Sequence, residues 1–320
     1  MSSVKTFMLD LSDLEFVHSG LARPESIIAE KDGTLWCSDN RGSVTRIDPD
    51  GTQTTIGTIT GETNGLAMDK EGNFYIAHIG NGNIYKMDRQ GNHEVILSEI
   101  EGRPLGSANY VFIDSQDRLW ISISSRDIPW FVACAAPRPD GYIILWDEQG
   151  PRIVADGLYF TNEIRLNADE SYLYAAETMM CRIVRYKVNE DGSLGPQEEV
   201  APGHLGEGRY VDGFTFDADG NLWVTTVISN GLGIITPDGD FHMVFEDRNE
   251  GALNNATEKI NASALQPMDM YACVGATLQF PASVTFAGPD LQTVYLGSLA
   301  MPHLVKFHSP VPGLPMRHWR

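Results

Sequence analysis

The sequence predicts an all-β protein, a six-bladed β-propeller, and three observations predict this fold class. A short strand centred on an aromatic residue recurs six times, a tight turn precedes each copy, and a second strand with alternating apolar residues precedes each turn. One such unit cannot bury both of its faces, so the units must pack side by side in a ring. Six units in 320 residues give roughly 53 residues each, close to the ~40–50 residues of known propeller repeats.

The recurring strand carries its aromatic residue third in a run of residues that favour β-structure. The six aromatic residues are Trp36, Tyr75, Trp120, Tyr174, Trp223 and Tyr295. The turns before them occupy residues 31–33, 70–72, 115–117, 168–170, 218–220 and 288–290. Several of these turns contain Asp-Gly or a similar pair, which favours a tight hairpin between two strands.

Before each turn we expect the inner strand of a blade. These strands are predicted at residues 26–29, 65–68, 110–113, 163–166, 213–216 and 283–286, and a third strand follows each aromatic strand. Residues 6–10 resemble a strand without a unit of its own, and we expect them to complete the last blade and close the ring. Six blades use the whole length, so we expect one domain over residues 1–320.

Two segments interrupt the repeat. Residues 124–139 form a long loop inside the third unit, and residues 249–280 lie between the fifth and sixth units. The second segment is expected to hold a helix, a lid or an oligomer contact, with a simple surface excursion as the alternative. Long loops in compact folds are often functional.

The charge balance excludes several classes of partner. With 23 Lys and Arg against 43 Asp and Glu, the formal net charge is −20, which argues against nucleic acid and anionic membranes. Many acids lie in turns such as 48–50 and 217–219, where we expect them to serve solubility. The chain lacks a signal-peptide pattern and its four cysteines are far apart, so a cytoplasmic protein with reduced thiols is expected.

A polar residue stands at the start of every inner strand. Counting eleven residues back from the aromatic residue in four units, and twelve in the two units with a longer turn, gives one position per unit. These positions hold Glu25, Asn64, Asn109, Asn162, Asp212 and Ser283. Inner strands of a propeller begin at one end of the channel, so we expect these side chains to converge there. Alternatively, each one only stabilises its turn.

This ring of oxygens suits a hard divalent cation. Ca²⁺ and Mg²⁺ take carboxylate and amide oxygens and need neither His nor Cys. Glu25 and Asp212 would balance the two positive charges, and Asn109 and Asn162 would add neutral oxygen ligands. We expect one divalent ion, Ca²⁺ first, with Zn²⁺, Mn²⁺ or Mg²⁺ as alternatives.

Four separated segments resemble the motifs of the SMP-30/gluconolactonase (regucalcin-like) family. They are Arg-Pro-Glu at 23–25, Ser-Ala-Asn at 107–109, Phe-Thr-Asn at 160–162 and the run 211–223. The resemblance implies a six-bladed propeller with one divalent metal at the channel mouth. It places the family's ligands on Glu25, Asn109, Asn162 and Asp212, and it implies hydrolysis of lactones, mostly sugar lactones, with organophosphates as substrates of some relatives.

The sequence departs from the family's pattern beside these residues. Tyr110 stands where Asp often follows the first ligand Asn, Glu163 stands where Gly often follows the second, and Val211 replaces a Pro. Residues 126–139 replace the loop common in gluconolactonases. We therefore expect the metal site to be retained and the substrate pocket to differ.

The function we expect is a metal-dependent lactonase in which the ion polarises the carbonyl and helps to activate water. Asp212 is the expected general base. Asn64 by its register, Arg126 and Trp130 in the variant loop, and His204 before the Asp212 strand are expected to bind the substrate.

Three alternatives stay open. They are an organophosphate or ester hydrolase on the same site, a strictosidine-synthase-like condensing enzyme, and a non-enzymatic binding propeller. The chain has no G-x-S-x-G sequence, which argues against a serine hydrolase. A homo-oligomer is also possible.

Overall fold

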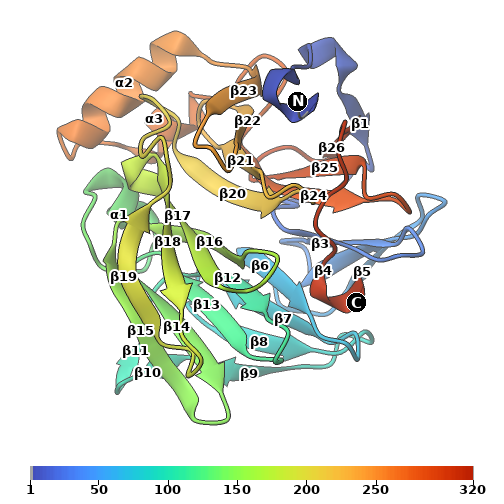
Figure 1. Ribbon diagram of the computed structural model, residues 1–320, viewed down its shortest axis with the longest axis vertical. Helices are drawn as coiled ribbons and strands as arrows, with labels where there is room; N and C mark the ends of the chain where they lie inside the picture. The colour runs from blue at the N-terminus through green and yellow to red at the C-terminus, as the bar shows by residue number, and fades with distance from the viewer. Residues whose placement is uncertain (1–2, 320) are drawn as a thin grey trace.

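Each repeat folds into a four-stranded antiparallel sheet, and six such sheets surround a central axis (Figure 1). The computed structural model describes residues 3–319. Within them, the predicted six-bladed β-propeller is confirmed, and the inner strand of every blade lies within three residues of its predicted position. The repeated order of inner strand, turn and aromatic strand in the sequence was therefore sufficient to locate the blades.

The first three blades follow the chain from the inner strand outward. Blade one contains β2 (Ile27–Ala29), β3 (Leu35–Ser38), β4 (Val44–Ile47) and β5 (Gln53–Ile56). Blade two contains β6 (Thr63–Met68), β7 (Phe74–His78), β8 (Ile84–Met87) and β9 (His93–Leu97). Blade three contains β12 (Ala108–Ile113), β13 (Leu119–Ile123), β14 (Gly141–Asp147) and β15 (Gly150–Leu158). A small hairpin, β10 (Glu99–Ile100) with β11 (Arg103–Pro104), lies between blades two and three.

The last three blades repeat the arrangement. Blade four contains β16 (Thr161–Leu166), β17 (Tyr172–Glu177), β18 (Arg182–Val188) and β19 (Leu194–Glu199). Blade five contains β20 (Val211–Phe216), β21 (Leu222–Thr226), β22 (Gly231–Ile235) and β23 (Phe241–Glu246). Blade six contains β24 (Pro281–Ala287), β25 (Thr293–Ser298), β26 (Leu304–His308) and the N-terminal β1 (Glu15–Val17).

The ring closes through β1, which pairs antiparallel with β26 at the outer edge of blade six. The expected strand at residues 6–10 is wrong. Residues 3–6 form the 3₁₀-helix η1 (Ser3–Thr6), Leu11–Asp13 form η2, and Phe7 and Leu9 pack on the core between blades five and six. The apolar side chains of Phe7 and Leu9 are therefore packed against the core although their backbone does not belong to a sheet.

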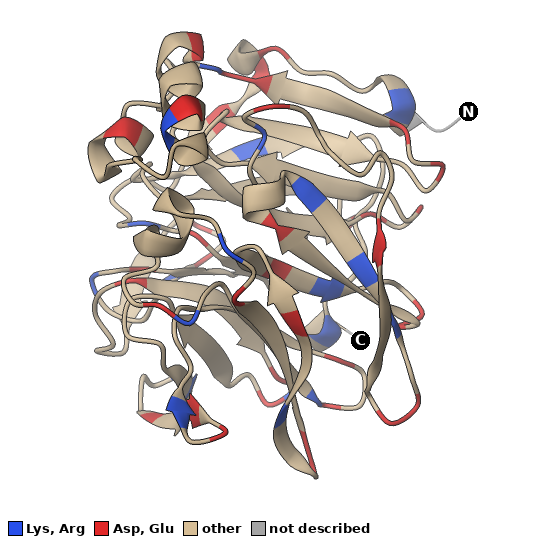
Figure 2. Cartoon of the chain, turned by 90° about the vertical axis from the view of Figure 1, so that its left-hand side faces the viewer, with Lys and Arg blue, Asp and Glu red and all other residues tan. Residues whose placement is uncertain are grey.

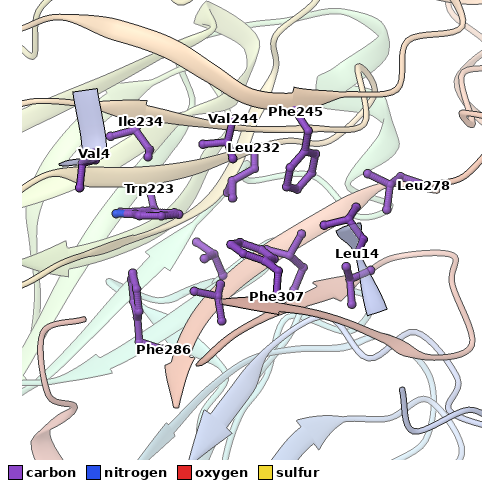
Figure 3. Packing of buried hydrophobic residues seen from close by; sticks show 14 of the residues in the cluster. Val4, Leu14, Trp223, Leu232, Ile234, Val244, Phe245, Leu278, Phe286 and Phe307 are labelled. Carbon is purple, nitrogen blue, oxygen red and sulfur yellow. The ribbon is translucent and has the colours of Figure 1, made fainter. Parts of the chain in front are cut away.

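Packing between neighbouring blades supplies the hydrophobic core. Figure 3 shows the cluster between blades five and six, where Trp223 of β21 meets Phe286 of β24 edge-on with ring centroids 5.4 Å apart. Val4 and Leu14 from the N-terminal segment join the same cluster. Large aromatic side chains bury much apolar area, so these contacts contribute strongly to ring stability.

Short helices cover one end of the propeller, on the upper left of Figure 1. They are α1 (Phe131–Ala135), η3 (Thr178–Met180), α2 (Glu250–Asn261) and α3 (Pro267–Tyr271). The two interrupting segments therefore form helices, with α1 in the first and α2 and α3 in the second. None of the helices in residues 3–319 is long and apolar enough to cross a membrane.

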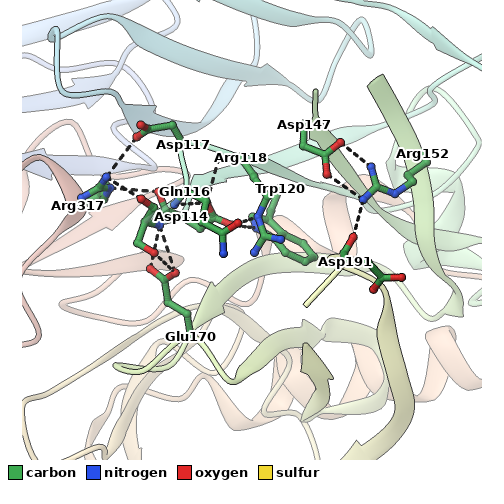
Figure 4. A network of polar contacts seen from close by, with 11 residues as sticks. Asp114, Gln116, Asp117, Arg118, Trp120, Asp147, Arg152, Glu170, Asp191 and Arg317 are labelled. Atoms are coloured by element: carbon green, nitrogen blue, oxygen red, sulfur yellow. Dashed lines mark hydrogen bonds and ion pairs between the residues drawn. The ribbon is translucent and has the colours of Figure 1, made fainter. Parts of the chain in front are cut away.

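The C-terminal segment covers the opposite end of the channel. Residues 314–318 line a cavity there with the later residues of five inner strands, and η4 (Arg317–Trp319) ends the described chain. Arg317 donates hydrogen bonds to the carbonyl oxygens of Asp114 and Ser115 in the hairpin of blade three (Figure 4). The channel is therefore covered at both ends, by helices at one and by the tail at the other.

Candidate metal centre

A cavity beneath the helices receives the predicted ring of oxygens. Glu25, Asn64, Asn109, Asn162 and Asp212 all line it, each at the start of its inner strand. The structure thus brings together five of the six positions that the register selected. The sixth, Ser283, is buried beside them and donates its hydroxyl to the backbone carbonyl of Glu25.

The two carboxylates of the ring, Glu25 and Asp212, are buried, and nearby charges affect the pKa of each. Burial, reinforced by the charges of Glu25 and Glu163, raises the pKa of Asp212 well above its usual range. Burial likewise raises the pKa of Glu25, and the nearby Arg23 opposes this effect. A buried carboxylate whose ionisation is opposed by other buried acids forms a place where an added cation would be stabilised.

The two asparagines present unpaired oxygens to the same place. The Asn109 amide nitrogen donates to Ser124 Oγ at 3.0 Å, and the Asn162 amide nitrogen donates to Thr178 Oγ1 at 3.2 Å. Each amide is thereby oriented, and Asn109 Oδ1 and Asn162 Oδ1 remain buried without a hydrogen-bond partner. Buried polar atoms in native proteins are almost always partnered, so these orphaned oxygens point to a ligand.

Ser124 and Thr178 are site residues that the sequence reasoning missed. Both stand four residues after the central aromatic residue of their blade, and the same position holds Asn40, Ile79, Val227 and Leu299 in the other blades. A hydroxyl at this position occurs in the two blades that contribute the orphaned asparagine oxygens. This pattern is visible in the sequence and would have identified Ser124 and Thr178 as site residues.

Asn64 and Arg23 form a separate arrangement on the cavity wall. Arg23 Nη2 donates to Asn64 Oδ1 at 2.8 Å, and Asn64 Nδ2 donates to the Asn109 carbonyl at 3.0 Å. Arg23 Nη1 lies 2.7 Å from Glu25 Oε2 as an ion pair, although without hydrogen-bond geometry. Both ends of the Asn64 amide are engaged, so Asn64 positions Arg23 in this structure.

Trp130 lines the cavity, whereas two of the other predicted substrate residues do not. The Arg126 guanidinium lies over the Tyr142 ring, 4.3 Å from its centroid, and pairs with Asp156 on the outside of blade three. His204 is exposed in a different depression and accepts a hydrogen bond from the Gly206 amide. Neither side chain lines this cavity, because a position in a nearby loop does not fix the direction of its side chain.

Two residues that depart from the family's pattern, Tyr110 and Glu163, fill the channel below the ring. Glu163 is buried and pairs with Arg165 at 3.1 Å, while the Arg165 guanidinium lies 5.3 Å from the centroid of the Tyr110 ring. A Cβ on Gly65 would meet Tyr110, and one on Gly213 would meet Glu163. Glycines in neighbouring blades therefore make room for the two larger side chains.

The donor set fits a hard divalent ion, although the set is not a cluster of acidic residues. No group of three or more His, Cys, Asp or Glu residues that could hold a metal occurs in the part of the chain that the structure describes. The set here is instead two carboxylates and two neutral amide oxygens, a combination that Ca²⁺ accepts in proteins. Charge, burial and the orphaned oxygens agree with this fit.

Residues 23–246 match the SMP-30/Gluconolactonase/LRE-like region, a protein family. The chain belongs to this family. The 6-deoxy-6-sulfogluconolactonase of Pseudomonas putida is 24% identical over 82% of this chain and 78% of its own length. Strictosidine synthase-like 13 of Arabidopsis thaliana is 29% identical over 52% of this chain, which spans only 41% of that plant protein.

Several solved structures share the fold at low sequence identity. A gluconolactonase from Xanthomonas campestris superposes with a TM-score of 0.70 at 20% identity, over 97% of this chain and 93% of that one. A calcium-binding regucalcin from Agrobacterium tumefaciens superposes with a TM-score of 0.66 at 15% identity, over 95% and 97%. Proteins with a similar fold thus include a gluconolactonase and a calcium-binding protein.

Proposed function

We propose that this protein is a metal-dependent hydrolase that opens a lactone ring. The observation that carries the proposal is the set of two buried carboxylates and two orphaned amide oxygens in one cavity of the channel. Membership of the SMP-30/gluconolactonase family and the similarity to lactonases support the same reaction class. The low identity to these relatives leaves the substrate to be determined from the site itself.

Glu25, Asn109, Asn162 and Asp212 are the residues that would hold the ion. Once bound, a divalent ion supplies Lewis-acid polarisation of the lactone carbonyl. Ser124 and Thr178 hold the two asparagine amides in the orientation that leaves their oxygens free. Arg23 keeps a positive charge at the cavity wall, next to Glu25.

Asp212 is the proposed general base. Its carboxylate would take a proton from the attacking water as the water oxygen bonds to the carbonyl carbon. The ring C–O bond then breaks, and the departing ring oxygen takes up that proton as it becomes a hydroxyl. The product is a hydroxy acid, which releases one proton at neutral pH.

The released proton gives a direct assay. A panel of γ- and δ-lactones is incubated with the protein in a weakly buffered pH indicator, after chelation and then with Ca²⁺, Mg²⁺, Mn²⁺ or Zn²⁺. The expected result is hydrolysis above the spontaneous rate that disappears on chelation and returns with at least one ion. No hydrolysis of any lactone with any ion would overturn the proposal.

The same assay, extended to aryl esters and organophosphates, separates the competing functions. Lactone hydrolysis that survives chelation would show that the reaction needs no metal, whereas hydrolysis of no lactone would leave the strictosidine-synthase-like alternative open. Metal-dependent hydrolysis of aryl esters or organophosphates without hydrolysis of lactones would assign the site to an ester or phosphotriester hydrolase.

A further inference from the structure

The wall of the cavity above the oxygen ligands is apolar. Ile79, Phe160, Val227, Met270, Phe280 and Leu299 line it. Three of these, Ile79, Val227 and Leu299, occupy the position four residues after the central aromatic residue, where the blades of Asn109 and Asn162 carry Ser124 and Thr178. In five of the six blades this position thus holds either a hydroxyl that orients a ligand asparagine or an aliphatic side chain of the cavity wall, and blade one holds Asn40.

Two phenylalanines are held in this wall by an uncommon backbone conformation. Phe160 and Phe280 have φ of 59° and 51°, in the left-handed region that bulky residues seldom adopt. Both precede an inner strand and are buried. Strain of this kind persists where the surroundings impose it and is concentrated at functional sites. The conformation brings two aromatic rings to the cavity lining.

The other polar side chains that line the cavity are already occupied. Trp130 Nε1 donates to the Glu62 carboxylate at 3.2 Å, and Thr178 Oγ1 both donates to the Val211 carbonyl and accepts from Asn162. Asn64 is engaged at both ends of its amide. Apart from the weakly polar Cys134 thiol, the described lining offers few side-chain partners beyond the ligand oxygens and Arg23.

A sugar lactone is poorly matched to this wall. Each of its ring hydroxyls would leave water for an apolar surface without gaining a hydrogen bond, which disfavours binding. The cavity has a volume of about 60 Å³, which is small. Its size and its apolar wall therefore favour a compact ring with hydrocarbon edges over a ring with several hydroxyls.

We propose that the substrate of this site is a small lactone whose ring carries hydrogen or alkyl groups in place of hydroxyls. This inference rests on the proposed lactone hydrolysis and adds the class of substrate. The lactone carbonyl would face the ligand oxygens, and the carbon atoms of the ring would contact Val227, Phe280 and Met270.

The test compares two lactones with the same six-membered ring, δ-valerolactone and glucono-δ-lactone. Each rate is divided by the spontaneous hydrolysis rate, because the two rings differ in reactivity. The expected kcat/KM, so normalised, is at least 100-fold higher for δ-valerolactone. Equal values or a preference for glucono-δ-lactone would overturn the inference while leaving lactone hydrolysis established.

A pair of variants on one helix tests the wall directly. Met270→Gln places an amide in the cavity lining, whereas Met268→Gln changes a side chain of α3 that is 74% exposed. We expect Met270→Gln to raise KM for δ-valerolactone at least tenfold and to narrow the preference over glucono-δ-lactone. Met268→Gln should change neither value, and equal effects of both variants would contradict the proposal.

Binding of unreactive lactams decides the question without turnover. δ-Valerolactam and gluconolactam are titrated into the wild-type protein, with and without Ca²⁺, and binding is measured by calorimetry. Tighter binding of δ-valerolactam supports the apolar substrate even if no lactone is hydrolysed, in which case the proposed reaction fails and the inferred pocket chemistry stands. Tighter binding of gluconolactam overturns the inference.

Discussion

At the scale of single residues, the register of the repeat predicted where the polar side chains converge. Glu25, Asn109, Asn162 and Asp212 line one cavity because the same position of each blade faces the channel. The role of Arg23 could not be predicted in this way. Its side chain reaches Glu25 and Asn64 from a left-handed backbone position, φ 57°, which a one-dimensional pattern does not reveal.

Replacement of Asp212 tests the chemistry. Asp212→Asn preserves the shape of the side chain and removes its ability to accept a proton, so kcat should fall by about 10²-fold or more with the fold intact. Progress curves with δ-valerolactone and circular dichroism measure the two effects. Asp156→Asn, an exposed acid of blade three, is the control. An unchanged rate would remove Asp212 from the reaction.

Arg23 competes with a metal for the charge of Glu25. Arg23→Met removes the positive charge that lies 2.7 Å from Glu25 Oε2. We expect Ca²⁺ affinity to increase about tenfold or more, since relief of ~1.4 kcal/mol of repulsion is sufficient. Calorimetric titration measures it, with Arg152→Met, which breaks an ion pair with Asp147 far from the cavity, as the control. Unchanged or weaker Ca²⁺ binding would show that Arg23 does not oppose the ion.

At the scale of elements, a turn acid anchors the central tryptophan of three blades. Glu30, Asp114 and Asp217 each stand six residues before Trp36, Trp120 or Trp223 and accept a hydrogen bond from its indole nitrogen. The expectation that Asp217 serves solubility is wrong, because Asp217 is buried. The six-residue spacing was visible in the sequence, but the direction of the carboxylate was not.

This anchoring predicts a loss of stability on truncation. Asp114 accepts hydrogen bonds from Trp120, from the Arg118 side chain and from two turn amides (Figure 4). Asp114→Ala leaves these buried donors unpaired and should lower the free energy of unfolding by about 3 kcal/mol. Urea unfolding measures the change. Asp50→Ala, in an exposed turn, should have a much smaller effect, and comparable losses would refute the anchoring role.

At the scale of the whole molecule, repetition made the fold predictable. Each blade repeats the same strands and turns, so errors in one unit do not alter the architecture. Ring closure was predicted less well, because residues 6–10 carry an apolar pattern that suits either a strand or a cap on the core. Helices α2 and α3 also follow no repeat, and only their position in the chain signalled them.

Charge is a second property of the whole molecule. The chain has 20 more acidic than basic residues, and Figure 2 shows Asp and Glu recurring in the turns between strands. Such an excess favours cations throughout the surrounding solution, but it does not by itself localise one. The specific feature is the pair of acids that the ring of blades buries together, Glu25 and Asp212.

Because these two acids come from blades one and five, an ion between them should stabilise the closed ring. Binding to the folded state alone raises the free energy of unfolding by about 2.7 kcal/mol when the free ion is at 100 times its Kd. Thermal unfolding with and without Ca²⁺ measures this as a higher Tm. Glu25→Gln should weaken Ca²⁺ binding and remove most of the shift, whereas Glu15→Gln, on the exposed edge strand β1, should retain it. A Ca²⁺-induced shift that survives Glu25→Gln would place the ion elsewhere, since the ring cannot hold it with one carboxylate as well as with two.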